Sequence, residues 1–343
     1  MAATMKAARI HAYGDELIVE DIAVPQPGAG QVLIKIIASG VCHTDLHATA
    51  GDMAGNPKLP FVPGHEIVGR VVSLGKDVSR TSEGDLVGVP SLHWACGQCE
   101  HCTGGWETLC LRQLATGYSV DGGFAEYVVA PSDFVVQIPE QADPFEMAPI
   151  LCAGVTTYKG LKQTQAKHGD WVVISGVGGL GHVAVQYARV FGYRVVAVDI
   201  DDDKLALAER HGAELTVNAA KDDAVSRVHD ETGGAHAVLV TAASASAFRS
   251  GVEMLRRGGV CVLNGLPPGD FPLPICNFVL AAQTVIGSII GTRRDMDEAV
   301  KLAVEVGIRT TVEKQPLENI NEIFRRLQNG QVVGRVVLDM TSN

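Results

Sequence analysis

The chain of 343 residues is long enough for two domains, each with a substantial core. Hydrophobic residues make up 46% and charged residues 20%, as in ordinary globular proteins, and 38 glycines indicate many tight turns. The formal net charge of −11 argues against nucleic acid or an anionic membrane as the main partner. A phosphate-bearing cofactor stays possible, since backbone dipoles can hold it.

The first ninety residues read as short strands separated by turns. We predict strands at 31–38 and 66–74, followed by a loop lobe rich in cysteine and glycine at 97–111. The N-terminus shows no apolar core and no cleavage pattern. We therefore expect no secretory signal and a cytoplasmic location.

From about residue 156, strands alternate with helices, which predicts a parallel α/β domain flanked on both sides by a mainly β domain. We expect the domains at 1–152, 153–290 and 291–343, with the last returning to the first. The elements predicted in this region are strands at 171–175, 194–198, 238–240, 260–264 and 334–339 and helices at 182–192 and 295–307.

Residues 271–292 carry no charged side chain. A transmembrane helix would need such a stretch, but Pro272, Pro274 and several polar residues interrupt it. We instead predict a buried strand at 285–290.

A glycine-rich turn follows the predicted strand at 171–175 and fits G-x-G-x-x-G. In such a turn the first glycine makes the bend, the second lets a pyrophosphate approach the backbone, and the third permits close helix–strand packing. A carboxylate at the end of the next strand would accept the ribose hydroxyls and repel a 2′-phosphate, which favours NAD over NADP. A purely structural turn is the alternative. The candidate cofactor contacts are Gly176, Gly178, Gly179, Leu180, Gly181 and Asp199.

Four of the eight cysteines lie close together, namely Cys96, Cys99, Cys102 and Cys110. Four soft thiolates in one short run suit a closed tetrahedral zinc that has no position for substrate, so its role would be structural. Free or disulfide-paired cysteines are the alternative, which this spacing disfavours. Cys261 and Cys276 match no motif, and we expect both to be small core residues.

A second candidate metal site is dispersed along the chain. Cys42 precedes His43, His65 precedes Glu66, and Cys152 lies far downstream. Spacing alone does not join Cys42, His65 and Cys152, since each taken singly is more often a buried residue than a ligand. Together, two thiolates and one imidazole would leave zinc neutral overall with an open position for a substrate oxygen.

The chain resembles the zinc-containing medium-chain alcohol dehydrogenases, specifically the bacterial and yeast-type branch. This resemblance implies a GroES-like, mainly β catalytic domain around a Rossmann domain with a doubly wound parallel sheet. It also implies a reversible, NAD-linked oxidation of an alcohol to an aldehyde or ketone. It runs from Lys6 to Asp339 and rests on the glycine turn, the four-cysteine lobe and the motifs at 40–45, 63–66, 122–127 and 333–335.

By position, the resemblance implies that Cys42, His65 and Cys152 ligate a catalytic zinc. Such a Cys2His set is the one established for alcohol dehydrogenase. Glu66 corresponds to a nearby carboxylate that exchanges onto the metal, and Asp45 to the partner that orients a ligand histidine through its other nitrogen. With the four-cysteine lobe, this implies two zinc ions per subunit.

The resemblance also implies a mechanism. Zinc would acidify the bound alcohol, so that an alkoxide passes hydride to nicotinamide. Thr44 would take the alcohol proton, and His47 would pass it to solvent through the cofactor ribose. Without the resemblance, an exposed loop histidine is the alternative interpretation of His47. The other implied cofactor contacts are His43 and Arg335 at the pyrophosphate, Thr156 at the nicotinamide, and Lys204 at the ribose. A solvated lysine on the surface of a helix is the alternative interpretation of Lys204.

The substrate is less well defined. Ser91 and Met53 stand where ethanol-specific relatives carry bulky aromatic residues, and Trp94 lies close by in the sequence. We therefore expect a wider pocket that accepts medium-chain, secondary or aromatic alcohols alongside ethanol. A polyol or formaldehyde dehydrogenase and a non-catalytic zinc-bearing regulatory protein are the alternatives. A nucleic-acid-binding zinc module would fit the four-cysteine lobe alone but conflicts with the acidic net charge.

We expect a small-molecule alcohol, aldehyde or ketone as the main partner, with no nucleic acid and no membrane. The family resemblance implies a homotetramer or homodimer. The uncharged residues 271–290 are the candidate subunit interface.

Overall fold

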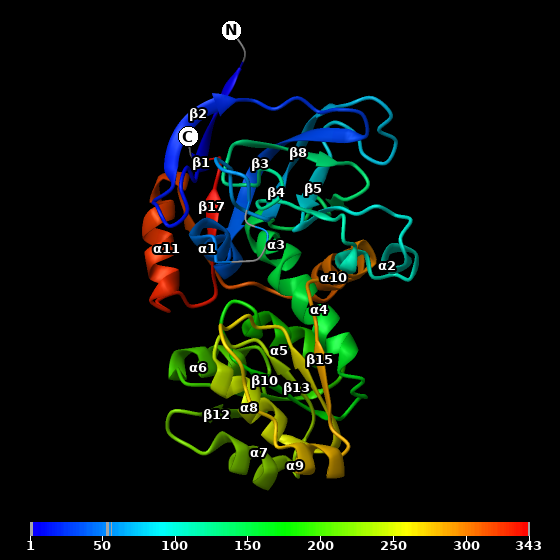
Figure 1. Cartoon of the computed structure of the whole chain (residues 1–343), viewed down its shortest axis with the longest axis vertical. Helices are drawn as coiled ribbons and strands as arrows, with labels where there is room; N and C mark the ends of the chain where they lie inside the picture. The colour runs from blue at the N-terminus through cyan, green and yellow to red at the C-terminus, as the bar shows by residue number, and fades with distance from the viewer. Residues whose placement is uncertain (1–2, 53–54, 56, 342–343) are drawn as a thin grey trace. The chain divides into compact units, whose positions relative to one another are not determined.

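The computed structural model describes residues 3–52, 55 and 57–341, which form two compact units (Figure 1). The first unit contains Met1–Cys152, Thr292–Glu305 and Thr310–Asn343, and the second contains Ala153–Gly291 and Val306–Arg309. Each unit has its own buried hydrophobic core.

The first unit is built on a seven-stranded, mostly antiparallel sheet in the order β16-β17-β3-β4-β5-β9, with β8 also paired to β3. The long strand β3 pairs with β4, β8 and β17, and its alternating residues Val32, Ile34 and Ile36 are buried in the core. The strands are β3 Gln31–Val41, β4 Glu66–Leu74, β5 Leu86–Val89, β8 Tyr127–Pro131, β9 Val136–Gln137, β16 Val312–Gln315 and β17 Arg335–Asp339.

Two small sheets and several short helices complete the first unit. The helix α11 buries Ile320, Ile323 and Leu327, whose spacing puts them on one face of the helix. The small sheets pair β1 Thr4–Arg9 with β2 Ile18–Ala23 and β6 Leu92–Trp94 with β7 Leu114–Ala115. The helices are α1 His43–Ala50, α2 Glu100–Thr103, α3 Pro144–Met147, α10 Arg293–Val306 and α11 Ile320–Gln328, with 3₁₀ turns η1 Glu107–Leu109, η2 Ala148–Leu151 and η3 Leu317–Asn319.

The second unit is a six-stranded parallel sheet in the order β12-β11-β10-β13-β14-β15. The strand order reverses between β10 and β13, which makes the carboxyl end of β10 the usual ligand position of such a sheet. The strands are β10 Trp171–Ser175, β11 Arg194–Asp199, β12 Leu215–Asn218, β13 Ala235–Val240, β14 Leu255–Leu263 and β15 Thr284–Gly287. The helices are α4 Ala153–Gln163, α5 Gly181–Val190, α6 Asp202–Arg210, α7 Ala224–Thr232, α8 Ala245–Glu253 and α9 Ile275–Leu280.

This architecture confirms the predicted fold class, a doubly wound parallel sheet together with a mainly β unit. The strands predicted at 66–74 and 171–175 have those bounds, and the other predicted elements differ at their ends. The lobe at 97–111 is mostly irregular but holds α2 and η1.

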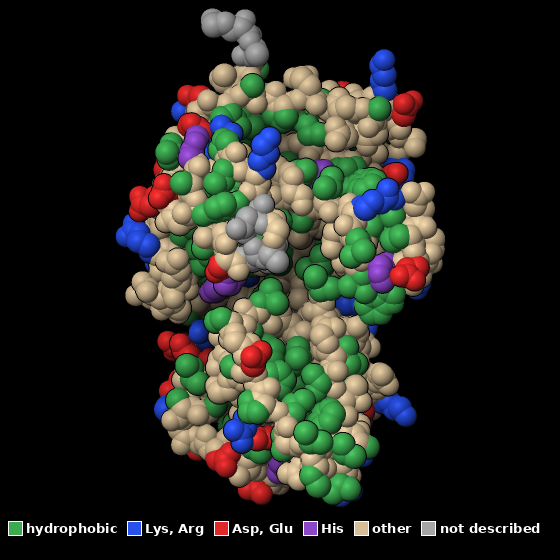
Figure 2. Space-filling model, viewed as in Figure 1, with side chains coloured by type: hydrophobic (Ala, Val, Ile, Leu, Met, Phe, Trp, Pro, Cys, Tyr) green, Lys and Arg blue, Asp and Glu red, His purple; other side chains and the backbone are tan. Residues whose placement is uncertain are grey.

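The prediction of a buried strand at 285–290 was wrong. The strand is β15, an edge strand with one neighbour, and its residues are half-buried or exposed. The preceding helix α9 also exposes Ile275, Val279 and Leu280, and Figure 2 shows apolar side chains gathered in this region of the second unit. The stretch lacks charged residues without being buried, because an edge strand has a neighbour on only one of its sides.

The prediction for Cys276 was also wrong, since this cysteine is exposed on α9, whereas Cys261 is buried as expected. Within the described ranges, no helix is long and apolar enough to cross a membrane.

Candidate active site

The pairing of β3 with β4 brings Cys42 and His65 together. The antiparallel register sets Gly40 opposite Glu66, so the residues that follow β3 lie beside those that precede β4. Gly40 is needed for this approach, because a Cβ at this position would collide with the Glu66 carboxylate. Two candidate ligands that are distant in sequence therefore become neighbours through the strand register.

Asp45 caps the helix α1 and orients His65. Its Oδ2 accepts a hydrogen bond from the Cys42 backbone N–H at 2.9 Å, and its Oδ1 accepts from the Gly64 N–H at 3.2 Å. The same Oδ1 lies 2.8 Å from His65 Nδ1. Since the Nδ1–H donates to the carboxylate, Nε2 keeps the lone pair that can bind a metal.

Cys152 completes a buried cluster. Its Sγ lies 3.9 Å from Cys42 Sγ and 3.3 Å from His65 Nε2, and it follows the fully buried turn η2. Ligand atoms of Cys42, His65, Glu66 and Cys152 all lie within 4.8 Å of one another. Two sulfurs on a tetrahedral zinc, with Zn–S bonds of about 2.3 Å, stand about 3.8 Å apart. The donor types and their spacing therefore fit zinc.

The protonation of this cluster also suits a cation. A hydrogen bond with Cys152, followed by the charges of Arg335 and His65, holds the pKa of the Cys42 thiol well below its ordinary value. Burial disfavours a charged His65, but Asp45 and the Cys42 thiolate together raise the pKa of His65 to about 10. Because zinc ligands bind in their deprotonated forms, a zinc ion would replace the proton shared within this cluster.

Glu66 links the cluster to Arg335. The Glu66 side chain is fully buried, and its Oε1 accepts a hydrogen bond from Nη2 of Arg335, which is buried as well. Among the described residues, Oε2 has no hydrogen-bond partner. A buried carboxylate oxygen without a partner is unfavourable, so a cation near Oε2 would stabilise it.

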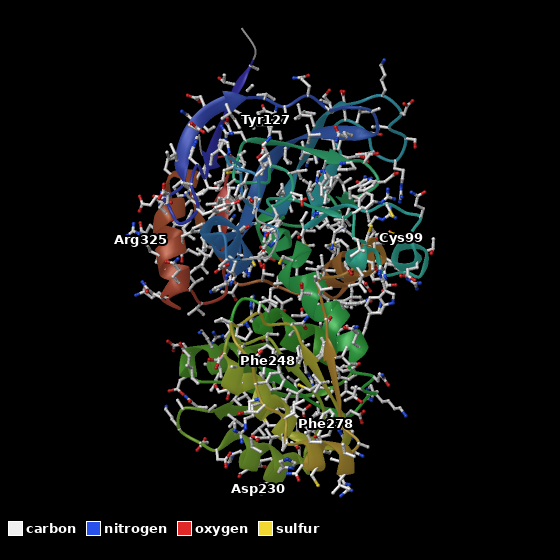
Figure 3. The ribbon with its side chains drawn as sticks, in the orientation of Figure 1. Cys99, Tyr127, Asp230, Phe248, Phe278 and Arg325 are labelled. Atoms are coloured by element: carbon white, nitrogen blue, oxygen red, sulfur yellow. The ribbon has the colours of Figure 1, made fainter. Side chains whose placement is uncertain are left out.

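The lobe that contains Cys99 (Figure 3) gathers four sulfurs. The Cys102 Sγ lies 3.5 Å from that of Cys99 and 3.9 Å from that of Cys96, and Cys110 completes the group within 4.8 Å. All four thiols are free. These spacings again match a tetrahedral zinc, with all four positions taken by protein sulfur.

The glycine turn of the second unit joins β10 to α5. Gly176 has a φ of 94°, and a Cβ on Gly181 would collide with the Gly176 carbonyl oxygen. A Cβ on Gly178, in contrast, would have no atom within 4 Å, so the backbone is open to a ligand there. Asp199 ends the neighbouring strand β11 and its Oδ2 accepts a hydrogen bond from the Val177 N–H at 2.6 Å.

Comparison with known proteins decides the family. Residues 28–140 match the alcohol dehydrogenase GroES-like domain, and residues 179–305 match the zinc-binding dehydrogenase family. An alcohol dehydrogenase of Moraxella sp. (strain TAE123) is 56% identical over 337 residues, which cover 98% of this chain and 100% of that protein. The chain belongs to the zinc-dependent medium-chain alcohol dehydrogenase family.

Solved structures agree with this assignment. The alcohol dehydrogenase of the hyperthermophilic archaeon Aeropyrum pernix superimposes with a TM-score of 0.90 at 34% identity, over 97% of this chain and 99% of that one. An acetophenone reductase from Geotrichum candidum in complex with NAD gives a TM-score of 0.89 at 28% identity, over 99% and 98% of the two chains. This protein is therefore an alcohol dehydrogenase that uses zinc and a nicotinamide dinucleotide, with a GroES-like first unit and a Rossmann second unit.

Thr44 and His47 lie on α1 of this alcohol dehydrogenase, three residues apart and therefore on the same side of the helix. The Thr44 Oγ1 is 3.7 Å from Cys42 Sγ. The His47 side chain is 36% exposed, so it can exchange protons with water.

The structure places the other predicted residues on separate elements. His43 is exposed at the start of α1, Thr156 is buried on α4, and Lys204 is half-buried on α6. Ser91, which directly precedes β6, and Trp94, the last residue of β6, are half-buried. Met53 lies outside the described residues.

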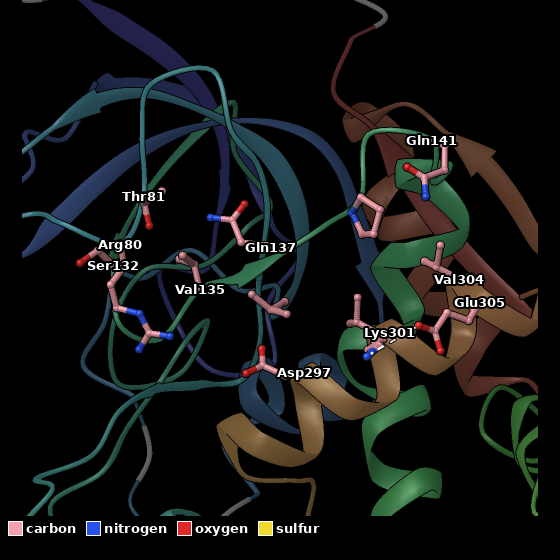
Figure 4. Close-up of a pocket in the computed structure, with 13 residues that line it drawn as sticks. Arg80, Thr81, Ser132, Val135, Gln137, Gln141, Asp297, Lys301, Val304 and Glu305 are labelled. Carbon is pink, nitrogen blue, oxygen red and sulfur yellow. Dashed lines mark ion pairs between the residues drawn. The ribbon is translucent and has the colours of Figure 1, made fainter.

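A cavity of about 450 Å³ in the first unit lies away from these residues. Figure 4 shows it between α10, which contributes Asp297 and Lys301, and the segment around β9. None of the described residues predicted for the zinc or coenzyme sites lines it.

The sequence reasoning missed two charged residues beside the expected sites. Arg112 follows the lobe, and its guanidinium helps the Gln98 backbone N–H to lower the pKa of Cys96 to about 5. Asp52 contacts His47 through its carboxylate. The only sequence signal for either residue is its charge close to a motif residue.

Proposed function

We propose that this enzyme reversibly oxidises primary or secondary alcohols with NAD, at a zinc site formed by Cys42, His65 and Cys152. The observation that carries the proposal is the buried cluster of two thiols and one imidazole, with Asp45 holding the imidazole through Nδ1. Glu66 supplies a carboxylate oxygen to the same cluster and would be a fourth ligand for the metal when neither water nor substrate occupies that position. We assign Cys96, Cys99, Cys102 and Cys110 to the structural zinc.

The residues of α1 carry the proton. When bound, zinc supplies a Lewis acid that acidifies the substrate hydroxyl, and the nicotinamide takes or gives the hydride. Thr44 Oγ1 accepts the proton of the substrate hydroxyl as it gives up its own O–H proton, and His47 takes up the released proton and delivers it to water. A bound cofactor would supply the ribose hydroxyl that connects the two residues. The position of both residues on one side of α1, with Thr44 near Cys42, supports this assignment.

The glycine turn holds the dinucleotide. Gly178 leaves room for the pyrophosphate beside the backbone N–H groups at the start of α5, and the Asp199 carboxylate selects NAD by repelling a 2′-phosphate. A higher kcat/KM with NADP than with NAD would contradict the role of Asp199. The remaining proposed contacts are Gly176, Gly179, Leu180 and Gly181 in the turn, His43 and Arg335 at the pyrophosphate, Thr156 at the nicotinamide and Lys204 at the ribose.

The domain assignment follows from these sites. We assign 1–152 and 291–343 to the catalytic domain and 153–290 to the NAD-binding domain. The division of the chain into two compact units supports this assignment.

Replacing Cys42 with Ala tests the catalytic site. We expect C42A to lose alcohol-dependent NADH formation, to retain NADH binding, and to fall from two zinc ions per subunit to one. Metal analysis, NADH fluorescence titration and steady-state kinetics on one sample measure these effects. Cys261→Ala removes a buried cysteine outside both clusters and is the matched control. Wild-type turnover in C42A would refute the assignment.

We infer the substrate range from the residue types at positions where ethanol-specific relatives carry aromatic residues. Ser91 is smaller than an aromatic residue, and an acetophenone reductase shares this fold, which supports medium-chain, secondary and aromatic alcohols as substrates alongside ethanol. A panel of alcohols should show kcat/KM holding or rising beyond two carbons. A steep fall beyond ethanol would favour a narrow pocket.

The assembly and location are proposed on separate grounds. The exposed apolar residues Ile275, Val279 and Leu280, beside the open edge of β15, support a homotetramer or homodimer that buries this face. A monomeric mass, measured by light scattering at micromolar protein concentration, would contradict this assembly. All eight cysteines are free thiols, which supports a cytoplasmic location because that compartment is reducing.

A further inference from the structure

His47 has a carboxylate partner at the C-terminal end of α1. Its Nδ1 lies 2.9 Å from Oδ2 and 3.1 Å from Oδ1 of Asp52. The intervening Gly51 closes the helix in the left-handed conformation, with a φ of 72° and its N–H bonded to the His47 carbonyl. A Cβ on Gly51 would stand 2.7 Å from the Tyr13 ring, so this turn depends on glycine. The turn thereby holds Asp52 within reach of His47.

The contact selects one tautomer of His47. Ionised carboxylate oxygens only accept hydrogen bonds, so the Nδ1 that faces Asp52 carries a hydrogen. The lone pair of the neutral ring then sits on Nε2. Nε2 has no hydrogen-bond partner in the part of the chain that the structure describes, which leaves it available to take up a proton.

The Asp52 carboxylate also lies next to the His47 ring when that ring becomes a cation. When Nε2 takes up a proton the ring becomes a cation, and a carboxylate at hydrogen-bond distance stabilises that cation. His43, one turn earlier on α1, interacts electrostatically with His47, and Tyr118 does so with Asp52. Of these neighbours, Asp52 is the one that supplies a negative charge to the ring.

We propose that Asp52 is a positioning residue for proton transfer, which holds His47 in the Nδ1-protonated form so that Nε2 can relay the substrate proton to water. The inference rests on the proposed proton path through Thr44 and His47. During oxidation, Nε2 binds the proton released by the alcohol, and the resulting imidazolium pairs with Asp52. Loss of that proton from Nε2 to water restores the neutral ring, while the Nδ1 proton remains in place throughout. Reduction uses the same steps in reverse.

A simple surface ion pair would behave differently. The side chains of His47 and Asp52 are 36% and 53% exposed, and such pairs contribute little to stability. Removing Asp52 should then leave the fold intact. Only a positioning role connects its removal to the rate of the reaction through His47.

The test is a double-mutant cycle on the full-length, zinc-loaded enzyme. We expect D52A to lower kcat for alcohol oxidation at pH 7 about tenfold, and D52N about threefold, because the amide oxygen still accepts the Nδ1–H without supplying charge. H47Q should lower kcat about tenfold, and D52A added to H47Q should lower it by less than about twofold more. Zinc content should match the wild type in all variants, and NADH affinity should match it in D52A and D52N. Asp15→Ala, which removes another exposed carboxylate of the first unit, is the control.

The outcomes separate the two proposals. A D52A enzyme with wild-type kcat, beside an impaired H47Q, overturns the role of Asp52 and leaves the proton path standing. If D52A lowers kcat by the same factor in the wild type and in H47Q, the role of Asp52 is also overturned, because Asp52 would then act independently of the imidazole. An H47Q enzyme with wild-type kcat overturns the proton path itself and this inference with it.

Discussion

Asp45 connects local folding to the metal site at the scale of a single residue. One carboxylate oxygen caps α1 through the Cys42 N–H, and the other holds the His65 ring. The Asp45 side chain is 1% exposed, so water cannot take over either contact. Removing the charge of Asp45 therefore weakens both the cap of α1 and the contact that orients the His65 ring.

Replacing Asp45 with Asn should weaken the buried zinc site. The amide keeps the shape but loses the charge and one acceptor oxygen, so we expect D45N to bind the catalytic zinc about 10- to 100-fold more weakly. The lobe zinc should be retained, and kcat should fall in proportion to the zinc that is lost. Dialysis against a competing chelator, followed by metal analysis, measures the affinity. Asp15→Asn is the control, and wild-type zinc affinity in D45N would rule out the orienting role.

The candidate ligands could be recognised one by one from the sequence, but their grouping could not be derived from spacing. Cys42 and His65 meet because Gly40 pairs with Glu66, and this register is set by packing across the whole sheet. The contact of Asp52 with His47 was missed for a related reason. It depends on the left-handed turn at Gly51, which returns the chain towards α1.

At the scale of elements, the glycines of the β10–α5 turn have different reasons for being glycine. Gly176 adopts a positive φ, and Gly181 packs its Cα against the Gly176 carbonyl. Gly178 faces open space. The first and last are thus required by the fold, whereas the fold alone does not require glycine at 178, which fits the proposed approach of the pyrophosphate there.

Two alanine substitutions should separate these roles. We expect G181A to destabilise the protein by about 1–3 kcal/mol or more, because the new methyl group collides with backbone. We expect G178A to change stability by less than about 1 kcal/mol but to weaken NADH binding at least about tenfold, because its methyl group occupies the approach of the pyrophosphate. Denaturant unfolding and NADH titration measure the two effects. Equal NADH affinity of G178A and wild type would show that the dinucleotide does not approach at this glycine.

The strands β10, β11, β13 and β14 were predictable because buried parallel strands are continuous apolar runs, rich in valine and isoleucine, between turn residues. The neighbouring strand β12 and short strands of the first unit such as β5 and β9 were not predicted. Two predictions failed in the apolar stretch at 271–292. There β15 is an edge strand and Cys276 is exposed on α9. Hydrophobicity alone does not distinguish a buried strand from an apolar surface, because both lack charge.

At the scale of the whole molecule, stability depends on a buried histidine in the coenzyme-binding unit. His182 on α5 is fully buried, and its Nδ1 lies 3.0 Å from the Gly178 carbonyl oxygen. Burial lowers the pKa of His182 to about 4. The unfolded chain binds a proton at this residue near pH 6.5, so it takes up more protons than the folded protein between about pH 6.5 and pH 4.

The free energy of unfolding should therefore decrease as the pH falls through this window. Relative to neutral pH, the contribution of His182 amounts to about 2 kcal/mol at pH 5. In His182→Asn, whose amide can still donate to the Gly178 carbonyl, the decrease between pH 7.5 and pH 5 should be smaller by this amount. Urea unfolding at several pH values measures it, with His168→Asn as a control that removes an exposed histidine. Parallel pH curves for H182N and wild type would refute the prediction.

The two sulfur clusters differ in how much chain each one encloses. Cys42 and Cys152 touch across a separation of 110 residues, so a metal held between them acts as a cross-link on most of the catalytic unit. The sulfurs of the lobe come from a single short segment and restrain only that segment. Loss of metal from the buried site would thus release a long closed loop and loosen the unit as a whole, whereas loss from the lobe would be a local event.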